Sequence, residues 1–205
     1  FQLVVIGSGP GGYAAAFRAA DLGLQVLLID KHYELGGVCL NRGCIPSKAL
    51  LHLAKVIEDA ESVSELGIKF NNPTIDVVKI QKWKSSVISK LNSGIASMAT
   101  SRNVERITGT ASFIDKNSLS IETDSGSKKI TFENCIIATG SRPAEIPGLP
   151  NDPRVINSTG ALSLKEIPNK MLVIGGGYIG LEMGGVYASF GSKITVAEFM
   201  PQLLT

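Results

Sequence analysis

Hydrophobic runs alternate with glycine turns at both ends of the chain. Residues 1–6 and 25–30 are dominated by apolar residues, which predicts two buried strands, and the alanine-rich stretch 11–22 between them predicts a helix. The same order of apolar run, glycine turn, helix and apolar run returns at residues 171–198. A strand, a helix and a second strand form a βαβ unit, so the pattern predicts an α/β chain with two copies of one nucleotide-binding unit.

In the middle of the chain the spacing of apolar residues changes from a helical period to a strand-like one. Residues 46–61 place apolar side chains on one helical face and a proline, Pro46, in the first turn, and residues 76–101 predict a second helix. Residues 104–132 then alternate short β-rich runs with polar turns, which predicts a β-meander inserted between the two α/β units. Residues 134–138 predict a further buried strand.

Proline marks the boundary between the two predicted domains. Five of the nine prolines lie between residues 142 and 168, as expected of an inter-domain crossover. We therefore expect a first domain at residues 1–142 whose final segment is absent, a crossover linker at 143–170, and at 171–205 the first βαβ unit of a truncated second domain.

Composition excludes several classes of protein. A hydrophobic content of 44% over 205 residues is enough to bury a core, and a net charge of +2 with no basic block longer than Lys128-Lys129 gives no footprint for nucleic acid. The most apolar stretches are too short to span a bilayer, so no membrane association is expected. Three cysteines, an odd number, favour a reducing compartment.

The first glycine turn has the spacing of a dinucleotide-binding fingerprint. Gly7, Gly9 and Gly12 fit G-x-G-x-x-G between a predicted strand and a helix, where backbone N–H groups can approach a pyrophosphate. Asp30 ends the next strand and offers a carboxylate to ribose hydroxyls. An ordinary tight turn is the alternative, but the strand, the helix and the acid together favour nucleotide binding.

The second glycine turn repeats these features. Gly175, Gly176, Gly177 and Gly180 open the second predicted helix, with Tyr178 and Ile179 inside the fingerprint, and Glu198 takes the place of the terminal acid. A carboxylate there accepts hydrogen bonds from a 2′-hydroxyl and repels a 2′-phosphate, and no arginine follows it. The second site is therefore expected to bind NAD rather than NADP.

A pair of cysteines lies between the first unit and the first central helix. Cys39 and Cys44 are separated by four residues, just before a helix whose N-terminal partial charge stabilises a thiolate, so they could cycle between dithiol and disulfide. Two buried thiols or half of a metal site are the alternatives, but no second cysteine or histidine pair completes zinc coordination. We predict no metal site, and we interpret Cys135 as a small core residue.

The cysteine segment carries a family resemblance. GGVCLNRGCIPSKALL at residues 36–51 resembles the redox-active segment of the flavoprotein disulfide reductases, the pyridine nucleotide-disulfide oxidoreductase family, and is most similar to its dihydrolipoamide dehydrogenases. The likeness extends over the whole chain and includes residues 109–111, 137–141 and 177–182. Val38 and Arg42 depart from the usual pattern, as does Asp30 where Glu is commoner, but none removes a required chemical group.

The resemblance implies a role for each part. Residues 1–142 would bind FAD and residues 171–205 would begin an NAD-binding domain. Cys39 would be the thiol that exchanges with substrate, Cys44 the thiol that faces the flavin, and Lys48 would lie beside the flavin, paired with Glu182. The residues implied for FAD are Gly7, Gly9, Gly12, Asp30, Lys31, Gly37, Lys48, Ala111, Thr139 and Gly140.

The implied reaction is oxidation of dihydrolipoamide to lipoamide, with electrons passing through the cysteine pair and FAD to NAD. The implied partners are a lipoyl group on an acyltransferase of a 2-oxo acid dehydrogenase complex and a second copy of the chain. The implied location is the cytoplasm, or the mitochondrial matrix in a eukaryote. The alternatives are a mercuric or glutathione-type reductase and a non-catalytic FAD-binding fragment. The family's catalytic base would lie beyond Thr205, so turnover is expected only of the full-length protein.

Overall fold

The computed structural model describes residues 1–204, which form two compact units. One unit comprises residues 1–42 and 88–142, and the other comprises residues 43–87 and the chain from residue 143 onward. The division into domains at 1–142, 143–170 and 171–205 stays a prediction.

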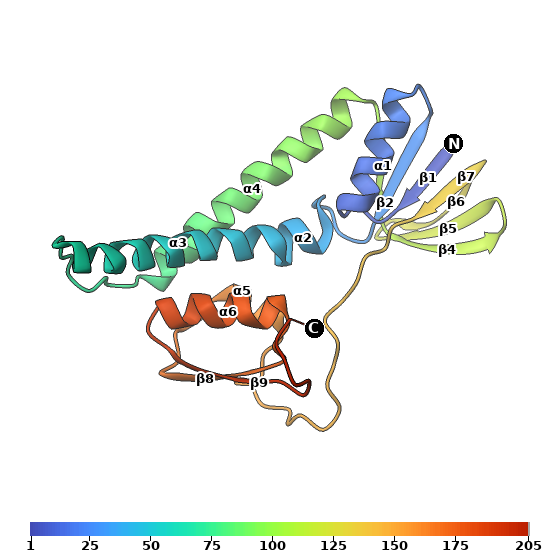
Figure 1. Cartoon of the computed structure of the whole chain (residues 1–205). Helices are drawn as coiled ribbons and strands as arrows, with labels where there is room; N and C mark the ends of the chain where they lie inside the picture. The colour runs from blue at the N-terminus through green and yellow to red at the C-terminus, as the bar shows by residue number, and fades with distance from the viewer. Residues whose placement is uncertain (205) are drawn as a thin grey trace. The chain divides into compact units, whose positions relative to one another are not determined.

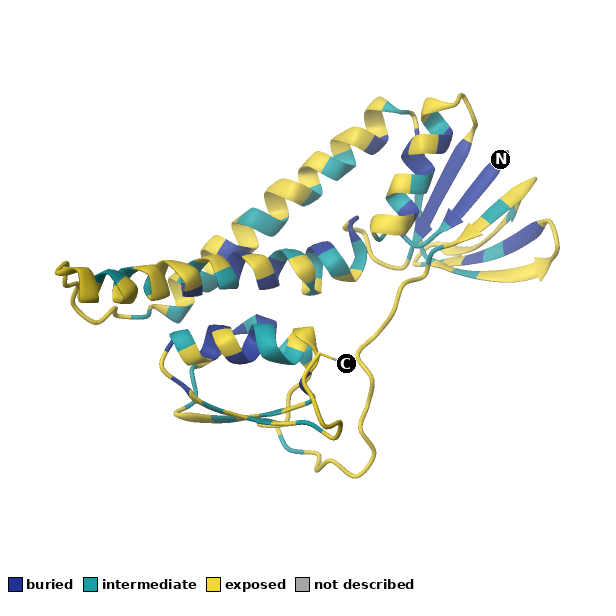
Figure 2. Ribbon diagram, in the orientation of Figure 1, coloured by how far each residue is buried: buried dark blue, intermediate teal, exposed yellow. Residues whose placement is uncertain are grey.

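The first unit is built on a four-stranded parallel sheet (Figure 1). Its strands lie in the order β3-β2-β1-β7, and helix α1 connects β1 to β2. The bounds are β1 Leu3–Ile6, α1 Pro10–Asp21, β2 Val26–Asp30, β3 Glu105–Thr108 and β7 Asn134–Ile137. β1 and β2 are buried almost throughout (Figure 2), since α1 packs on them through Ala16 and Phe17 and apolar residues of the second sheet lie against Val4 and Leu27. The α/β class and the first βαβ unit are confirmed.

The predicted meander is smaller than residues 104–132. β4 Thr110–Asp115, β5 Ser118–Thr123 and β6 Gly126–Thr131 form a three-stranded antiparallel sheet, whereas β3 joins the parallel sheet beside β2. The reason is connectivity: short turns force β4, β5 and β6 to run antiparallel, while β3 follows a long helix and can return parallel to β2.

The last strand of the parallel sheet is less buried than its sequence suggests. β7 was predicted to be a buried strand, but Ile137 is 65% exposed and Cys135 is only partly buried. In the part of the chain that the structure describes, β7 is the edge strand of the sheet and pairs with β1 alone, so one of its sides has no neighbouring strand.

Three α-helices follow the first βαβ unit. They are α2 Gly37–Arg42, α3 Cys44–Ser62 and α4 Val77–Ser101, with a 3-10 turn at Val63–Leu66. The two long helices were predicted, although α3 begins two residues earlier than expected, whereas α2 was not. The chain passes from one unit to the other after Val87, inside α4, so α4 contributes to both units.

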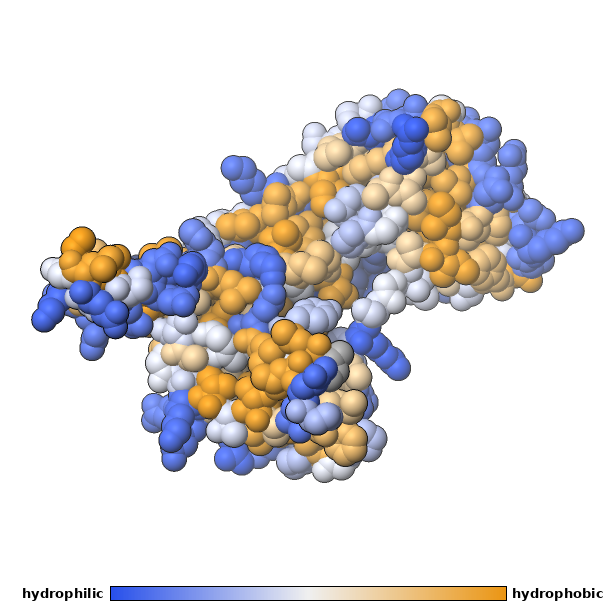
Figure 3. Space-filling model, viewed as in Figure 1, coloured by the Kyte–Doolittle hydropathy of each residue, from blue (hydrophilic) through white to orange (hydrophobic). Residues whose placement is uncertain are grey.

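The second unit has a core of helices and a two-stranded sheet. α5 Ser158–Ser163 precedes the parallel pair β8 Lys170–Ile174 and β9 Lys193–Ala197, which α6 Tyr178–Ser189 connects. Leu50 of α3 and Tyr187 of α6 lie in one buried cluster. Hydrophobic side chains are exposed on the surface of the molecule (Figure 3), and in the 3-10 turn that follows α3 Leu66 is 81% exposed. Among residues 1–204, no helix is long and apolar enough to cross a membrane.

Candidate functional sites

The first glycine turn brings β1, α1 and the end of β7 into close contact. Gly7 has φ +102° and donates its N–H to the Ile29 carbonyl at 2.7 Å. A Cβ on Gly7 would overlap the Ala138 carbonyl, and one on Gly12 would overlap the carbonyl oxygen of Gly7. Because both positions exclude any side chain, the sequence can fold into this turn only with glycine at each.

Asp30 closes the first glycine turn from the end of β2. One carboxylate oxygen accepts the Ser8 N–H at 2.7 Å and the Ser8 hydroxyl at 2.6 Å, and the other accepts the His32 N–H at 2.9 Å. Burial raises the pKa of Asp30, but the hydrogen bonds from Ser8 and His32 outweigh it, so the pKa lies below the ordinary value. The carboxylate is thus kept ionised, and its remaining lone pairs can accept ribose hydroxyls.

The start of α1 is open to an anion. Gly9 is the N-cap and makes no side-chain cap, and Pro10 follows as the first helical residue. A Cβ on Gly37 would lie 2.7 Å from the Cα of Gly9, so only glycine lets the cysteine segment approach this turn. Unpaired helix N–H groups beside a surface of glycine backbone fit the pyrophosphate of a dinucleotide.

The other residues implied for this site lie at different distances from the turn. The Cα of Thr139 is 3.1 Å from the Cβ that Gly7 lacks, and Gly140 follows with φ +72°. Gly109 donates its N–H to the Asp30 carbonyl at 2.8 Å, which holds the strand that carries Ala111 near the acid. Lys31 is exposed directly after Asp30, and no described contact joins it to the glycines.

The second glycine turn has the same local form. Gly175 has φ +104° and donates to the Ala197 carbonyl at 2.8 Å, and a Cβ on Gly180 would overlap the Gly175 carbonyl. Glu198 accepts the Gly176 N–H at 2.5 Å. Hydrogen bonds from the N–H groups of Met200 and Gly176 lower the pKa of Glu198. Gly177 caps α6, whose first residues, Tyr178 and Ile179, are exposed.

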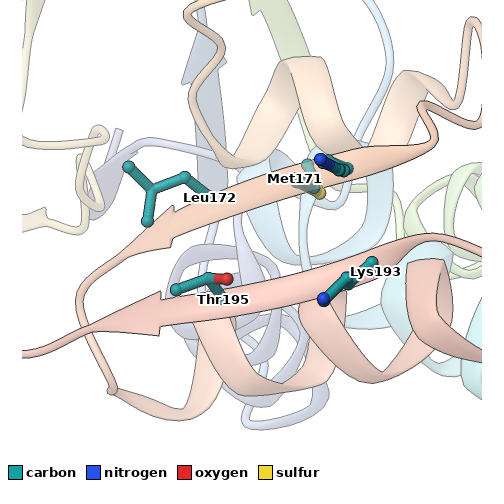
Figure 4. A pocket seen from close by; sticks show the side chains of 5 residues that line it. Met171, Leu172, Lys193 and Thr195 are labelled. Carbon is teal, nitrogen blue, oxygen red and sulfur yellow. The ribbon is translucent and has the colours of Figure 1, made fainter.

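A shallow hollow lies along β8 and β9 and is lined by no residue of the second glycine turn (Figure 4). It measures about 520 Å³ and is lined by Lys170, Met171, Leu172, Lys193 and Thr195. In the register of the two strands Lys170 lies opposite Lys193 and Leu172 opposite Thr195. These residues line the open side of a two-stranded sheet, and they include no acid, histidine or cysteine that could serve as a catalytic or metal-binding group.

The two cysteines of the central motif lie on two different helices. Cys39 is inside α2 and half-buried, whereas Cys44 is the first residue of α3 and exposed. The expectation that both precede a single helix is therefore wrong: residues 37–42 close a helical turn of their own before Gly43 interrupts the chain. Cys39 and Cys44 belong to different compact units, so their pairing stays a prediction from sequence spacing. Burial raises the pKa of Cys135, which is only partly buried where it packs against the core.

Lys48 and Glu182 form an ion pair within the second unit. The Lys48 ammonium contacts one oxygen of Glu182, and the Ser47 hydroxyl donates to the other at 2.5 Å. Burial raises the pKa of Glu182, but the hydrogen bonds from Lys48 and Ser47 prevail and place the pKa below its ordinary value. Residues more than 130 positions apart are thus brought together around the Glu182 carboxylate.

Three polar residues of these sites were not assigned a role from the sequence. Ser8 is fully buried and carries two of the hydrogen bonds to Asp30, and Ser47 completes the contacts of Glu182. Asn41 binds both ends of the turn that leads into α2. A serine inside a glycine fingerprint, facing an acid one strand away, could have indicated Ser8, but no local pattern marks the other two. Among residues 1–204, no three potential metal-ligating side chains gather.

Comparison with known proteins agrees with the site geometry. A family model described as pyridine nucleotide-disulphide oxidoreductase matches residues 1–205. The chain is 52% identical over 204 residues to dihydrolipoyl dehydrogenase from Vibrio cholerae, covering 99% of this chain and 43% of that protein. It is 49% identical over 201 residues to dihydrolipoyl dehydrogenase from Bacillus subtilis, covering 98% of this chain and 43% of that protein.

A solved structure supports the same likeness at the level of the fold. The HOCl-induced flavoprotein disulfide reductase RclA from Escherichia coli superposes with a TM-score of 0.83 at 33% identity, covering 100% of this chain and 43% of that one. The chain thus spans less than half the length of the curated relatives and the solved structure that it matches.

Proposed function

The chain belongs to the pyridine nucleotide-disulphide oxidoreductase family, and from that premise we propose that it is part of a dihydrolipoamide dehydrogenase. The observation that carries the proposal is the cysteine pair Cys39 and Cys44 in a chain about half identical to dihydrolipoyl dehydrogenases. The reaction is the oxidation of a dithiol to a disulfide. It requires the longer protein, because the chain covers only 43% of these relatives.

A disulfide between Cys39 and Cys44 accepts two electrons from the dithiol substrate. A substrate thiolate attacks Sγ of Cys39, the Cys39–Cys44 bond breaks, and Cys44 leaves as a thiolate. The second substrate thiol then displaces Cys39, so that one substrate disulfide forms for each protein disulfide reduced. Half-burial of Cys39 still leaves part of it accessible to solvent, which this exchange needs.

The first glycine turn is proposed to hold FAD through the N–H groups at the start of α1 and the ionised Asp30. When bound, FAD supplies two-electron redox chemistry between the thiols and a nicotinamide. Lys48, held by Glu182, contributes a fixed positive charge at the start of α3. We assign the other cofactor-binding and catalytic residues the roles that the family resemblance implies for them.

NAD is proposed as the nicotinamide of the second turn. The Glu198 carboxylate is held at the Gly176 N–H, its pKa is lowered, and a 2′-phosphate would meet a negative charge. The test is kcat/KM for NAD and NADP in the complete protein, with Glu198→Ala expected to narrow the preference for NAD. Equal use of NADP by the unaltered protein would favour the glutathione-type reductase instead.

Selective alkylation tests the cysteine pair itself. In the two-electron-reduced complete protein, iodoacetamide should modify Cys39 before Cys44, because the exchanging thiol must be reachable by substrate. Cys39→Ser should give a long-wavelength absorbance band from a Cys44 thiolate next to oxidised flavin, and Cys44→Ser should not. Cys135→Ser is the matched control and should change neither result. Lipoamide turnover retained by both single variants would refute the proposal.

The partners follow from the proposed substrate. A lipoyl group on an acyltransferase of a 2-oxo acid dehydrogenase complex would deliver the dithiol, and the protein would act as a homodimer. Copurification with a lipoylated acyltransferase and the mass of the complete protein in solution test the two points separately. The alternative, a non-catalytic FAD-binding protein, predicts that a protein as long as the relatives binds flavin but does not oxidise a dithiol.

A further inference from the structure

The amide side chain of Asn41 bonds back to the start of the helix that carries Cys39. α2 has only six residues, and Asn41 reaches back to its beginning, where Nδ2 donates to the Leu35 carbonyl at 3.0 Å and to the Gly37 carbonyl at 2.9 Å. Helices this short are marginal in isolation, since few intrahelical bonds offset the cost of nucleation. The two bonds of Asn41 therefore fix the turn in which Cys39 lies.

A second amide orients the first. Both protons of Asn41 Nδ2 are used, and its amide oxygen Oδ1 accepts a hydrogen bond from Asn92 Nδ2 of α4 at 2.7 Å. This chain of bonds also fixes the orientation of Asn92, because the reversed amide would set two carbonyl oxygens against each other. Both asparagines belong to the first compact unit.

Asn92 makes this contact at a cost. Its Oδ1 is buried and accepts no hydrogen bond among residues 1–204. An unsatisfied buried acceptor is destabilising, so an apolar residue here would be tolerated or favoured if stability alone mattered. The polar contact from Asn92 to Asn41 is thus difficult to explain by folding alone.

We propose that Asn92 and Asn41 are positioning residues for Cys39, through which α4 holds the cysteine-bearing helix against the first glycine turn. Gly36 N–H donates to the Ser8 carbonyl at 2.8 Å at the other end of the same turn, so α2 is fixed both to the nucleotide-binding loop and to α4. The inference rests on the proposed function, because positioning matters only if Cys39 exchanges with substrate.

The test measures how fast Cys39 reacts. In the reduced complete protein, methyl methanethiosulfonate is added and the modification of Cys39 and Cys135 is followed by peptide mass spectrometry. Asn92→Leu keeps the branched shape and the number of side-chain heavy atoms and removes the donor, so α2 should loosen and Cys39 should react about fivefold faster while Cys135 is unchanged. Asn92→Asp has the same size but places an oxygen against Asn41 Oδ1, and its effect should be larger still. Ser93→Ala, an exposed neighbour on α4, is the matched control.

The outcomes separate the proposal from its rivals. Rates for Cys39 within twofold of the unaltered protein in both Asn92 variants would overturn it. An equal rise at Cys135 would also overturn it, because that result shows general loosening of the unit rather than release of α2. If Cys39 responds as expected but cannot be oxidised to a disulfide in the unaltered protein, the positioning stands and the proposed dehydrogenase function fails.

Discussion

The two glycine turns of this protein have nearly the same geometry in very different surroundings. Gly7 and Gly175 have φ of +102° and +104°, and each donates to the carbonyl near the end of the following strand, at 2.7 and 2.8 Å. In each turn the third glycine of the fingerprint faces the carbonyl oxygen of the first. The acid that closes each turn accepts the N–H of the residue after the first glycine.

The strands around these turns differ. β1 and β2 are buried between α1 and the antiparallel sheet, whereas every other residue of β8 and β9 is exposed (Figure 2). Leu28 is 1% exposed and Leu172 is 60% exposed. The geometry of a glycine turn is therefore set by its own backbone, while the burial that stabilises the flanking strands comes from the neighbouring layers. The predictions below test whether that separation is real.

The largest expected effect comes from filling the space between turn and helix. Gly12→Val and Gly180→Val each place a side chain on a backbone carbonyl that cannot move without opening the turn. In the complete protein, Gly12→Val should abolish flavin retention and lower the free energy of unfolding by about 3 kcal/mol. Gly180→Val should keep the flavin and lose at least tenfold in kcat/KM for NAD.

Flavin absorbance after gel filtration, urea unfolding and steady-state kinetics measure these three quantities. Gly9→Ala is a milder control, since a Cβ there would lie 3.9 Å from Gly37 and meet nothing closer. Flavin lost equally from Gly12→Val and Gly180→Val would mean that the two turns do not act separately.

Truncating one leucine in each unit should show the difference in burial directly. Leu28→Ala removes a fully buried side chain from β2 and should cost about 3 kcal/mol in the free energy of unfolding. Leu172→Ala, made in a protein of residues 1–205, should lower the free energy of unfolding by less than about 0.5 kcal/mol, because the Leu172 side chain is already largely in water. Urea unfolding of the two variants measures both, and similar losses would contradict the exposure of β8.

This contrast also shows what the sequence could predict. The strands, helices and acids of both βαβ units follow from local periodicity and glycine spacing, and the structure reproduces them to within about two residues, as such boundaries allow. Burial of residues 134–138 was predicted wrongly because apolar composition does not reveal that β7 is an edge strand. The placement of β3 in the parallel sheet likewise depends on a partner 78 residues away, as in the pair Leu27 and Glu105.

The sites divide in the same way. Gly7, Gly12 and Asp30 lie within one short segment, so their spacing was enough to predict that they meet. Lys48 and Glu182 were paired only through family resemblance, and Ser47 and Asn92 carry no local signal because their partners are distant in sequence. Contacts across such separations depend on tertiary packing, which periodicity does not describe.

The two acids should respond to pH with the same sign and different size. Asp30→Asn should cost about 1–2 kcal/mol at pH 7, since it weakens charge-assisted bonds from Ser8 and His32 in a half-exposed site. The folded-state pKa of Asp30 is lowered below its ordinary 3.8, so its contribution is present above that value and is lost as pH falls through the folded pKa.

Unfolding of the unaltered protein and Asp30→Asn at pH 7, 5, 4 and 3 measures this dependence. The difference between them should be constant from pH 7 to 5 and shrink below about pH 4. Glu198→Gln should show the same trend more weakly, because Glu198 accepts two backbone N–H groups, whereas Asp30 accepts two and also the hydroxyl of the buried Ser8. A difference for Asp30→Asn that grows on acidification would contradict the hydrogen-bonded, ionised Asp30.

The smallest expected effect distinguishes the helices that follow the two turns. Gly11 in α1 and Gly185 in α6 have open space where a Cβ would lie, so alanine can be added without a clash. Gly185 is in the interior of its helix, where Gly→Ala should raise the free energy of unfolding by about 0.5–1 kcal/mol through reduced freedom of the unfolded chain. Gly11 is in the first turn of α1, where helix propensity matters less than in the interior. The gain in the free energy of unfolding from Gly11→Ala should therefore be about 0.3 kcal/mol or less. Thermal and urea unfolding of both variants would measure the difference, and a loss of stability in Gly185→Ala would mean that α6 has a neighbour at that position.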